Sequence, residues 1–311
     1  METRKLYYEN PFQKGFASTV VSCDEVKGGY AVVLAETAFY PEGGGQPYDT
    51  GVLGEANVLE VHEKNGVITH LCDKPLAVGA SVSGKIDWAR RFDHMQQHSG
   101  EHICSGLICA RFHCDNVGFH MGADTVTIDF NADISWDELM EIEALANLYI
   151  YEDHPIDIQF YRGAELDRVE YRSKKPLEGD VRIVSFPGAD CCACCGTHVA
   201  RSGQVGLVKF LSVQKFRDGV RIELLSGKRA HRYLSECWAQ DVRVAQALSV
   251  KPTASYAGVE RVLTELSSLK QRCAKLEESV FAQTAAQYEG KGDVLLFEDE
   301  MSGDSLRKLC D

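Results

Sequence analysis

The stretch Asp93-His-Met-Gln-Gln-His-Ser-Gly-Glu-His102 contains three histidines, of which two pairs stand four residues apart. Apolar residues continue a helical spacing beyond it and no proline interrupts, so we expect a helix over residues 93–112. Because one helical turn takes about 3.6 residues, His98 and His102 leave the same face and can bind one ion together. The pair His94 and His98 has the same spacing, so spacing alone does not choose between the two pairs.

A second cluster of ligand side chains, Cys194-Cys-Gly-Thr-His198, follows much later in the chain. It again offers two ligands four residues apart, in a glycine-containing loop that we expect between two strands. Three imidazoles and one thiolate suit Zn²⁺, which accepts tetrahedral nitrogen and sulfur ligands, and the thiolate argues against magnesium or calcium. The neighbouring residues Cys191, Cys192 and Cys195 remain open as alternative ligands or as small buried apolar side chains.

The composition is that of a soluble protein. Hydrophobic residues make up 44% and charged residues 25% of the 311 residues. No apolar run reaches the roughly 20 residues that span a bilayer, and the N-terminus has no secretory signal. We therefore expect a cytoplasmic location, where the 12 cysteines stay reduced and favour metal binding or catalysis over disulfides.

The formal net charge of −13 argues against non-specific binding of nucleic acid, which needs a basic surface. A local group of cations could still form a basic patch on such a protein. Two groups are candidates: Arg168, Arg172, Lys174 and Lys175, and Lys209, Lys215, Arg217 and Arg221.

Short strand-like runs separated by Gly, Asn and Asp occupy residues 1–90, and this pattern predicts a small β-barrel. The runs are Tyr30–Leu34, Val58–Val61, Val67–Leu71 and Val82–Ile86. Residues 91–228 are predicted to form an α+β domain, in which the capping box Ser135-Trp-Asp-Glu138 begins a second helix. Its expected strands are Thr125–Phe130, Ile156–Phe160, Val181–Val184, Val205–Phe210 and Val220–Leu224.

The remaining residues are predicted to be mainly helical. Within residues 229–290, apolar side chains from Val259 to Val280 recur in steps of three and four, which is typical of a coiled-coil-like seam in a helical hairpin or a homodimer. Residues 291–311 contain one strand candidate, Asp293–Phe297, and one helix start at Ser305. Because these cannot bury their own faces, we expect the beginning of an incomplete C-terminal domain. The predicted fold class is therefore α+β, with an N-terminal β-barrel, an α+β domain and a C-terminal helical or coiled-coil segment.

A glycine-rich segment, Thr37-Ala-Phe-Tyr-Pro-Glu-Gly-Gly-Gly-Gln-Pro-Tyr-Asp-Thr-Gly51, is the other dense motif. Successive glycines let the backbone approach a ligand closely, and the flanking aromatic rings offer faces on which a base or ribose can stack. The alternative is a tight barrel turn. No Gly-Lys-Ser/Thr follows, so the segment is not a phosphate-binding P-loop. The predicted substrate-binding residues are Phe39, Tyr40, Gly43, Gly44, Gly45 and Gln46.

These motifs, in this order, resemble the editing domain of alanyl-tRNA synthetase, and most closely its stand-alone relatives, the long AlaX trans-editing proteins. The resemblance covers residues from about 10 to 230. The stretches that carry it are Thr37–Gln46 with Asp49–Gly51, His98–His102, Cys194–Val199 with Ser202–Gly206, and Gly219–Gly227. One departure is Cys195, which stands where the family usually has glycine.

The resemblance implies an aminoacyl-tRNA deacylase that removes serine, or glycine, from mischarged alanine tRNA without ATP and so protects the fidelity of protein biosynthesis. The implied fold is a small β-barrel followed by an α+β editing domain. The implied zinc ligands are His98, His102, Cys194 and His198. No synthetase catalytic domain precedes the barrel, so we expect the protein to act in trans.

Hydrolysis of the ester needs a positioned water molecule and a stabilised oxyanion, to which zinc can contribute. Four protein ligands make a closed site, whereas catalytic zinc keeps a position open. We therefore expect either that His198 or His98 yields to water or substrate, or that zinc mainly anchors the terminal ribose and amino acid. Preference for serine over alanine needs a polar partner for the serine hydroxyl, and we predict Thr37 for this role.

Two other functions remain open at this stage. Residues His98–His102 also fit the His-x-x-Glu-His pattern of zinc peptidases, in which Glu101 would be the general base and a downstream glutamate the third ligand. The chain could also be a zinc-stabilised tRNA-binding module without activity. Assays of peptide hydrolysis and of seryl-tRNA hydrolysis distinguish these functions.

Overall fold

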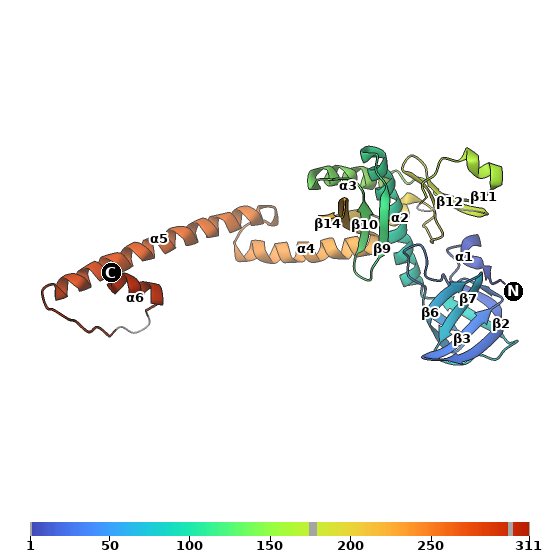
Figure 1. Cartoon of the computed structure of the whole chain (residues 1–311), viewed down its shortest axis with the longest axis horizontal. Coiled ribbons are helices and arrows are strands. Elements are labelled where there is room, and N and C mark those ends of the chain that lie inside the picture. Colours follow the sequence, from blue (N-terminus) through green and yellow to red (C-terminus); the bar gives the residue numbers. More distant parts are fainter. Residues whose placement is uncertain (1, 174–178, 298–300, 311) are drawn as a thin grey trace. The chain divides into compact units, whose positions relative to one another are not determined.

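The computed structural model describes residues 2–173, 179–297 and 301–310 (Figure 1). The chain divides into two compact units, residues 1–234 and 235–311. Helices and strands both build the first unit, so the α+β class predicted from the sequence is confirmed. The finer domain boundaries predicted near residues 90, 228 and 290 stay predictions.

Six strands of the first unit hydrogen-bond in the closed order β2-β3-β7-β6-β5-β8 and form a barrel (Figure 1). Alternate residues point inward, and Val32, Val61 and Ile68 among them are completely buried. Four of the strands contain the runs predicted from the sequence. The bounds are β2 Gly15–Val26, β3 Gly29–Leu34, β5 Gly51–Leu53, β6 Ala56–Lys64, β7 Val67–Cys72 and β8 Ser81–Ile86.

A short N-terminal element packs against this barrel. Strand β1 (Arg4–Lys5) pairs in parallel with β4 (Glu36–Thr37), and the single-turn helix α1 (Leu6–Glu9) follows it directly. The glycine-rich segment leaves β4 and returns to the barrel at β5. The segment therefore begins in the two-stranded β1-β4 sheet and ends in the barrel.

Helix α2 (Trp88–Phe112) is the predicted histidine-rich helix. It begins before residue 93 because the Asp87 side chain caps it by accepting a hydrogen bond from the Arg90 N–H. It ends at His113, which has a left-handed φ of 50°. Its middle is buried although many of its side chains are polar, since it packs against α3, β13 and β15.

A four-stranded antiparallel sheet in the order β14-β15-β10-β9 forms the second core together with α2 and α3 (Figure 1). Helix α3 (Trp136–Tyr151) begins at the predicted capping box, in which Ser135 and Glu138 each bind the other's backbone N–H. The strand bounds are β9 Asn116–Met121, β10 Val126–Phe130, β14 Val208–Phe216 and β15 Gly219–Ser226.

A three-stranded antiparallel sheet in the order β11-β12-β13 precedes the second ligand cluster. Cys194 follows the last residue of β13 directly, so the cysteine-rich loop begins at a sheet edge. The bounds are β11 Asp157–Arg162, β12 Asp180–Phe186 and β13 Asp190–Ala193, with 3₁₀ turns η1 Gly163–Arg168 and η2 Ser202–Val205.

The remaining elements are helical, as predicted. They are α4 (Gly227–Ala247), the 3₁₀ turn η3 (Pro252–Ala254), α5 (Ser255–Tyr288) and α6 (Gly303–Cys310). The predicted strand Asp293–Phe297 is wrong: these residues form no strand, and Leu295 and Phe297 are exposed. A strand needs a neighbour for its backbone N–H and C=O groups, and an apolar run alone does not provide one.

Candidate metal centre

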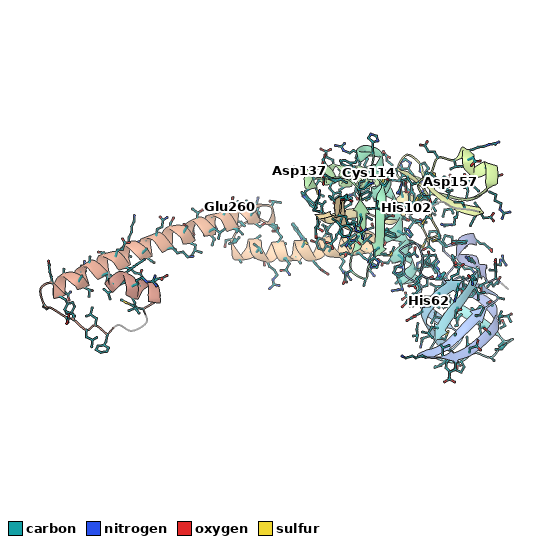
Figure 2. The ribbon with its side chains drawn as sticks, in the orientation of Figure 1. His62, His102, Cys114, Asp137, Asp157 and Glu260 are labelled. Atoms are coloured by element: carbon teal, nitrogen blue, oxygen red, sulfur yellow. The ribbon has the colours of Figure 1, made fainter. Side chains whose placement is uncertain are left out.

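Four side chains from two distant stretches of the first unit converge on one point. They are His98 and His102 of α2, and Cys194 and His198 of the loop after β13. One ligand atom of each lies within 4.8 Å of the others, and Figure 2 labels His102 among the packed side chains of this unit. The sulfur of Cys194 lies 3.5 Å from Nε2 of His98 and 3.4 Å from Nε2 of His198. This group can hold a metal ion.

Each imidazole is oriented through its other nitrogen. Nδ1 of His98 lies 2.9 Å from Oε1 of Gln46, and Nδ1 of His102 lies 2.8 Å from Oδ2 of Asp190. The third contact is the longest, 3.4 Å between Oγ of Ser99 and Nδ1 of His198. These partners fix the ring orientations and leave Nε2 for a metal, as outer-shell groups do in metalloproteins.

Asp190 is the most strongly held of these orienting groups, and sequence reasoning missed it. Arg172 donates to both of its carboxylate oxygens, at 2.7 and 2.8 Å. Burial alone would raise the pKa of Asp190, but the hydrogen bonds from His102 and Arg172 keep the pKa below its ordinary value. The carboxylate is therefore ionised and can hold the His102 ring. The only sequence signal was its place four residues before Cys194.

The thiol of Cys194 is prepared for metal binding. Burial would raise the pKa of Cys194, but the neighbouring imidazoles of His98, His198 and His102 keep that pKa well below the ordinary value. A thiolate is the form of cysteine that binds metals. The local charge balance therefore favours the ligand form of this residue.

Replacing Asp190 with asparagine is expected to weaken metal binding about 10- to 100-fold, the usual cost of losing an outer-shell partner. The substitution keeps the volume but removes the charge opposite His102. Affinity is measured by competition between the protein and a chelating dye, with zinc as the probe.

The matched control is Asp180→Asn, which removes an exposed carboxylate of β12 that pairs with Arg162. Its affinity for zinc should equal that of the unchanged protein. Equal affinities for the Asp190→Asn and Asp180→Asn variants would show that Asp190 does not support the ligand.

A cavity of about 480 Å³ opens beside the four ligands. Its size lies in the range of small-molecule sites. The glycine-rich segment contributes Gly44 and Gly45, and β9 contributes Phe119, whose ring centroid lies 4.9 Å from that of His98. Gly45 has a φ of 83°, and a Cβ there would meet Phe119. Glycine is therefore required where the segment closes over the cavity.

Glu101 also lines this cavity and is buried. Its Oε1 accepts hydrogen bonds from Ser105 Oγ at 2.6 Å and from Asn116 Nδ2 at 2.8 Å. The structure thus brings the predicted catalytic carboxylate to the candidate site. It also adds Ser105 and Asn116, which sequence reasoning had not assigned to it.

The other predicted substrate-binding residues lie elsewhere. Gln46 is buried behind His98, where its side chain also donates to Thr197 Oγ1 at 2.9 Å, and Gly43 belongs to the tight turn that Gln46 closes. Phe39 and Tyr40 are buried in the barrel core. Rings packed in this core present no face to a base or ribose. The predicted stacking of these rings on the substrate stays a prediction, and their burial does not favour it.

Thr37 is likewise completely buried. Its hydroxyl accepts a hydrogen bond from the Phe39 N–H at 3.1 Å and lies 2.9 Å from Nε2 of His70. Thr37 does not line the cavity beside the ligands. Its predicted contact with a serine hydroxyl therefore stays a prediction without geometric support.

Of the extra histidine and cysteines, His94 lies apart from the four ligands, whereas Cys192 and Cys195 line the cavity beside them. His94 lies outside both candidate ligand groups of the described residues, which resolves the ambiguity of spacing. Cys192 forms the second such group with His102 and Asp190, whereas Cys195 lies 3.7 Å from the hydroxyl of Tyr40.

Two family models match the chain. The model of "tRNA synthetases class II (A)" matches residues 7–90, and the model of the "Threonyl and Alanyl tRNA synthetase second additional domain" matches residues 181–223. The second match includes Cys194 and His198.

Three curated relatives show how far the similarity extends. The chain is 35% identical to the alanine–tRNA ligase of Pyrococcus abyssi, over 100% of the chain and 36% of that protein. It is 31% identical to the alanyl-tRNA editing protein Aarsd1-A of Xenopus laevis, over 85% of the chain and 66% of that protein. It is 30% identical to the alanyl-tRNA editing protein AlaX-L of Pyrococcus horikoshii, over 94% of the chain and 74% of that protein.

The chain spans about a third of the length of the alanine–tRNA ligases that it matches. Among the helices of the described residues, none combines the length and the apolar character needed to cross a bilayer.

Proposed function

Because the chain belongs to the alanyl-tRNA editing protein family, we propose that it is an aminoacyl-tRNA deacylase that hydrolyses the ester between a wrongly attached amino acid and alanine tRNA. The observation that carries this proposal is the convergence of His98, His102, Cys194 and His198 beside a cavity of small-molecule size. The proposed substrates are seryl-tRNA and, second, glycyl-tRNA, and the proposed location is the cytoplasm.

Zinc is the metal proposed for the site. Bonds of about 2.3 Å to sulfur and 2.0–2.1 Å to nitrogen at tetrahedral angles separate neighbouring ligand atoms by about 3.5 Å. The separations of 3.5 and 3.4 Å between Cys194 Sγ and two imidazole nitrogens fit this geometry. When bound, zinc supplies Lewis-acid polarisation of the ester carbonyl.

The protein's own residues supply the remaining chemistry of the proposal. Glu101 accepts a proton from a water molecule while the oxygen of that water attacks the ester carbonyl carbon. The proton then passes from Glu101 to the ribose oxygen when the ester bond breaks. Ser105 and Asn116 hold Oε1 of Glu101 and so fix its direction. Gly44 and Gly45 let the terminal ribose approach the backbone, and Phe119 offers the aromatic face of the cavity.

The peptidase alternative is weaker. It requires a downstream glutamate as third ligand, and neither candidate ligand group within the described residues contains one. Cys194 and His198 occupy the remaining positions instead. The pattern His98–His102 therefore does not carry a peptidase function.

A homodimer through the C-terminal helices also remains a proposal. Apolar side chains along α5, among them Val259, Leu266, Leu269 and Val280, are exposed within the second unit. A seam of this spacing is suited to a second helix.

Deacylation of seryl-, glycyl- and alanyl-tRNA, measured side by side with zinc-loaded protein, tests the proposed function. We expect seryl-tRNA to be hydrolysed at least about 100-fold faster than alanyl-tRNA, because a site that binds a hydroxyl rejects the analogue without one.

Equal rates on seryl- and alanyl-tRNA would contradict an editing role. Tight binding of tRNA with no hydrolysis would favour a non-catalytic module.

A further inference from the structure

A second cavity of about 420 Å³ lies in the first unit, and the proposed deacylation does not use it. Side chains of α2 and of the first turns of α4 line it, together with the turn between β9 and β10. The charged or titratable residues of its lining are Arg90, Asp93, His94, Lys228, Arg229 and Arg232.

This cavity is strongly cationic on a protein of net charge −13. Four cationic side chains and one carboxylate, that of Asp93, line the cavity, and Arg229 binds this carboxylate at 2.7 Å. Lys228 and Arg229 belong to the first turn of α4, where the helix dipole adds a partial positive charge. The excess charge is suited to an anion.

His94 supplies an independent sign that this cavity binds a ligand. Its ring is buried, and Nδ1 has no hydrogen-bond partner among the described residues. A buried polar nitrogen without a partner costs free energy unless a ligand supplies one. Burial, together with Arg90 and Arg229, lowers the pKa of His94 to about 3, so the ring is neutral and can donate one hydrogen bond.

The cavity lies about one helical turn along α2 from the metal centre. His94 lies four residues before His98 on α2, a rise of about 6 Å. The glycine-rich segment contributes Gly45 to the first cavity and Pro47 to the second. A substrate whose ester lies beside the four ligands therefore has its next chemical groups close to the cationic cavity.

Four of the eight basic residues noted in the sequence already bind carboxylates. Of the basic groups noted in the sequence, Lys209, Lys215 and Arg221 pair with Glu143, Asp133 and Asp129. Arg172 is bound to Asp190, and Lys174 and Lys175 lie outside the described residues.

We propose that the cavity formed by Arg90, His94, Lys228, Arg229 and Arg232 binds a backbone phosphate of the substrate tRNA while the aminoacyl ester lies beside the metal centre. This inference rests on the proposed deacylase function and adds the site that holds the RNA strand. The ligand is a phosphodiester, recognised through charge and one imidazole donor rather than through a base.

The test is the double variant Lys228→Gln and Arg232→Gln. Its control, Lys27→Gln and Lys74→Gln, removes the same charge from exposed barrel positions. Binding of fluorescently labelled alanine tRNA is measured at several salt concentrations. The double variant should bind tRNA about tenfold more weakly than its control does. The negative slope of log affinity against log salt concentration should become shallower by about 1. Zinc content and hydrolysis of seryl-adenosine, an ester without phosphates, should stay unchanged.

Two results would overturn the inference. One is a double variant that binds tRNA with the same affinity and salt slope as its control. If inorganic phosphate still binds to the unchanged protein in that case, the cavity is a site for a free anion and not for tRNA. The other is an equal loss on seryl-adenosine and seryl-tRNA, which indicates a distorted metal centre. If the unchanged protein binds tRNA with the expected salt slope but hydrolyses no ester, the deacylase function fails and the phosphate site stands.

Discussion

Replacing Cys194 with serine is expected to remove bound zinc and to lower the deacylation rate on seryl-tRNA by about a thousandfold. The sulfur is the ligand atom that lies near both His98 and His198, and a serine hydroxyl does not ionise to replace it. Electrophilic stabilisation by a metal contributes several kcal/mol, which corresponds to this change in rate. Zinc per chain is measured by mass spectrometry, and the rate by loss of labelled serine.

The matched control is Cys195→Ser. Cys195 is the adjacent residue, its side chain lies near Tyr40, and it belongs to neither candidate ligand group of the described residues. Because Cys195 also lines the cavity beside the ligands, the readout of this control is its zinc content, which should equal that of the unchanged protein. A Cys194→Ser variant with full zinc content, or a Cys195→Ser variant without zinc, would mean that the ligand set is wrong.

Replacing Asp49 with alanine is expected to lower the free energy of unfolding of the first unit by about 3–5 kcal/mol, since it leaves a buried charge unpaired. Asp49 and Arg91 are both completely buried and form an ion pair. Arg91 also donates to the backbone oxygens of Pro11 at 2.8 Å and Ala38 at 2.7 Å. The pair thus joins the start of α2 to the glycine-rich segment. Urea unfolding measures the change.

The control for this prediction is Glu141→Ala, which removes the exposed partner of Arg111. An exposed pair is worth about 0–1 kcal/mol, so this variant should unfold almost like the unchanged protein. If Asp49→Ala costs no more than Glu141→Ala, the buried pair does not hold the barrel to α2.

Features that depend on local spacing could be predicted from the sequence. The helix that carries His98 and His102 follows from apolar periodicity, and the start of α3 follows from the capping box at Ser135. Both patterns act within one or two turns of chain, so neighbouring residues contain the necessary information. The convergence of the four ligands was expected from the family resemblance, and the geometry agrees with it.

Features that depend on tertiary contacts could not be predicted. Asp190 orients His102 across 88 positions of sequence, and Gln46 orients His98 across 52. Nothing local distinguishes these two residues from other polar side chains. The aromatic rings beside the glycines appeared available for stacking, but barrel closure buries them. The run Asp293–Phe297 has strand propensity without a neighbouring strand, and propensity alone does not decide such cases.

X-ray absorption at the zinc edge, on protein loaded with one equivalent of zinc, tests the central claim most directly. The proposed set of His98, His102, Cys194 and His198 predicts one sulfur at about 2.3 Å and three nitrogens at about 2.0 Å. A coordination shell with two or more sulfur atoms would indicate that Cys192 or Cys195 also binds the metal. A coordination shell without sulfur would exclude Cys194 as a ligand. Either result would contradict the ligand set on which the proposed deacylase depends.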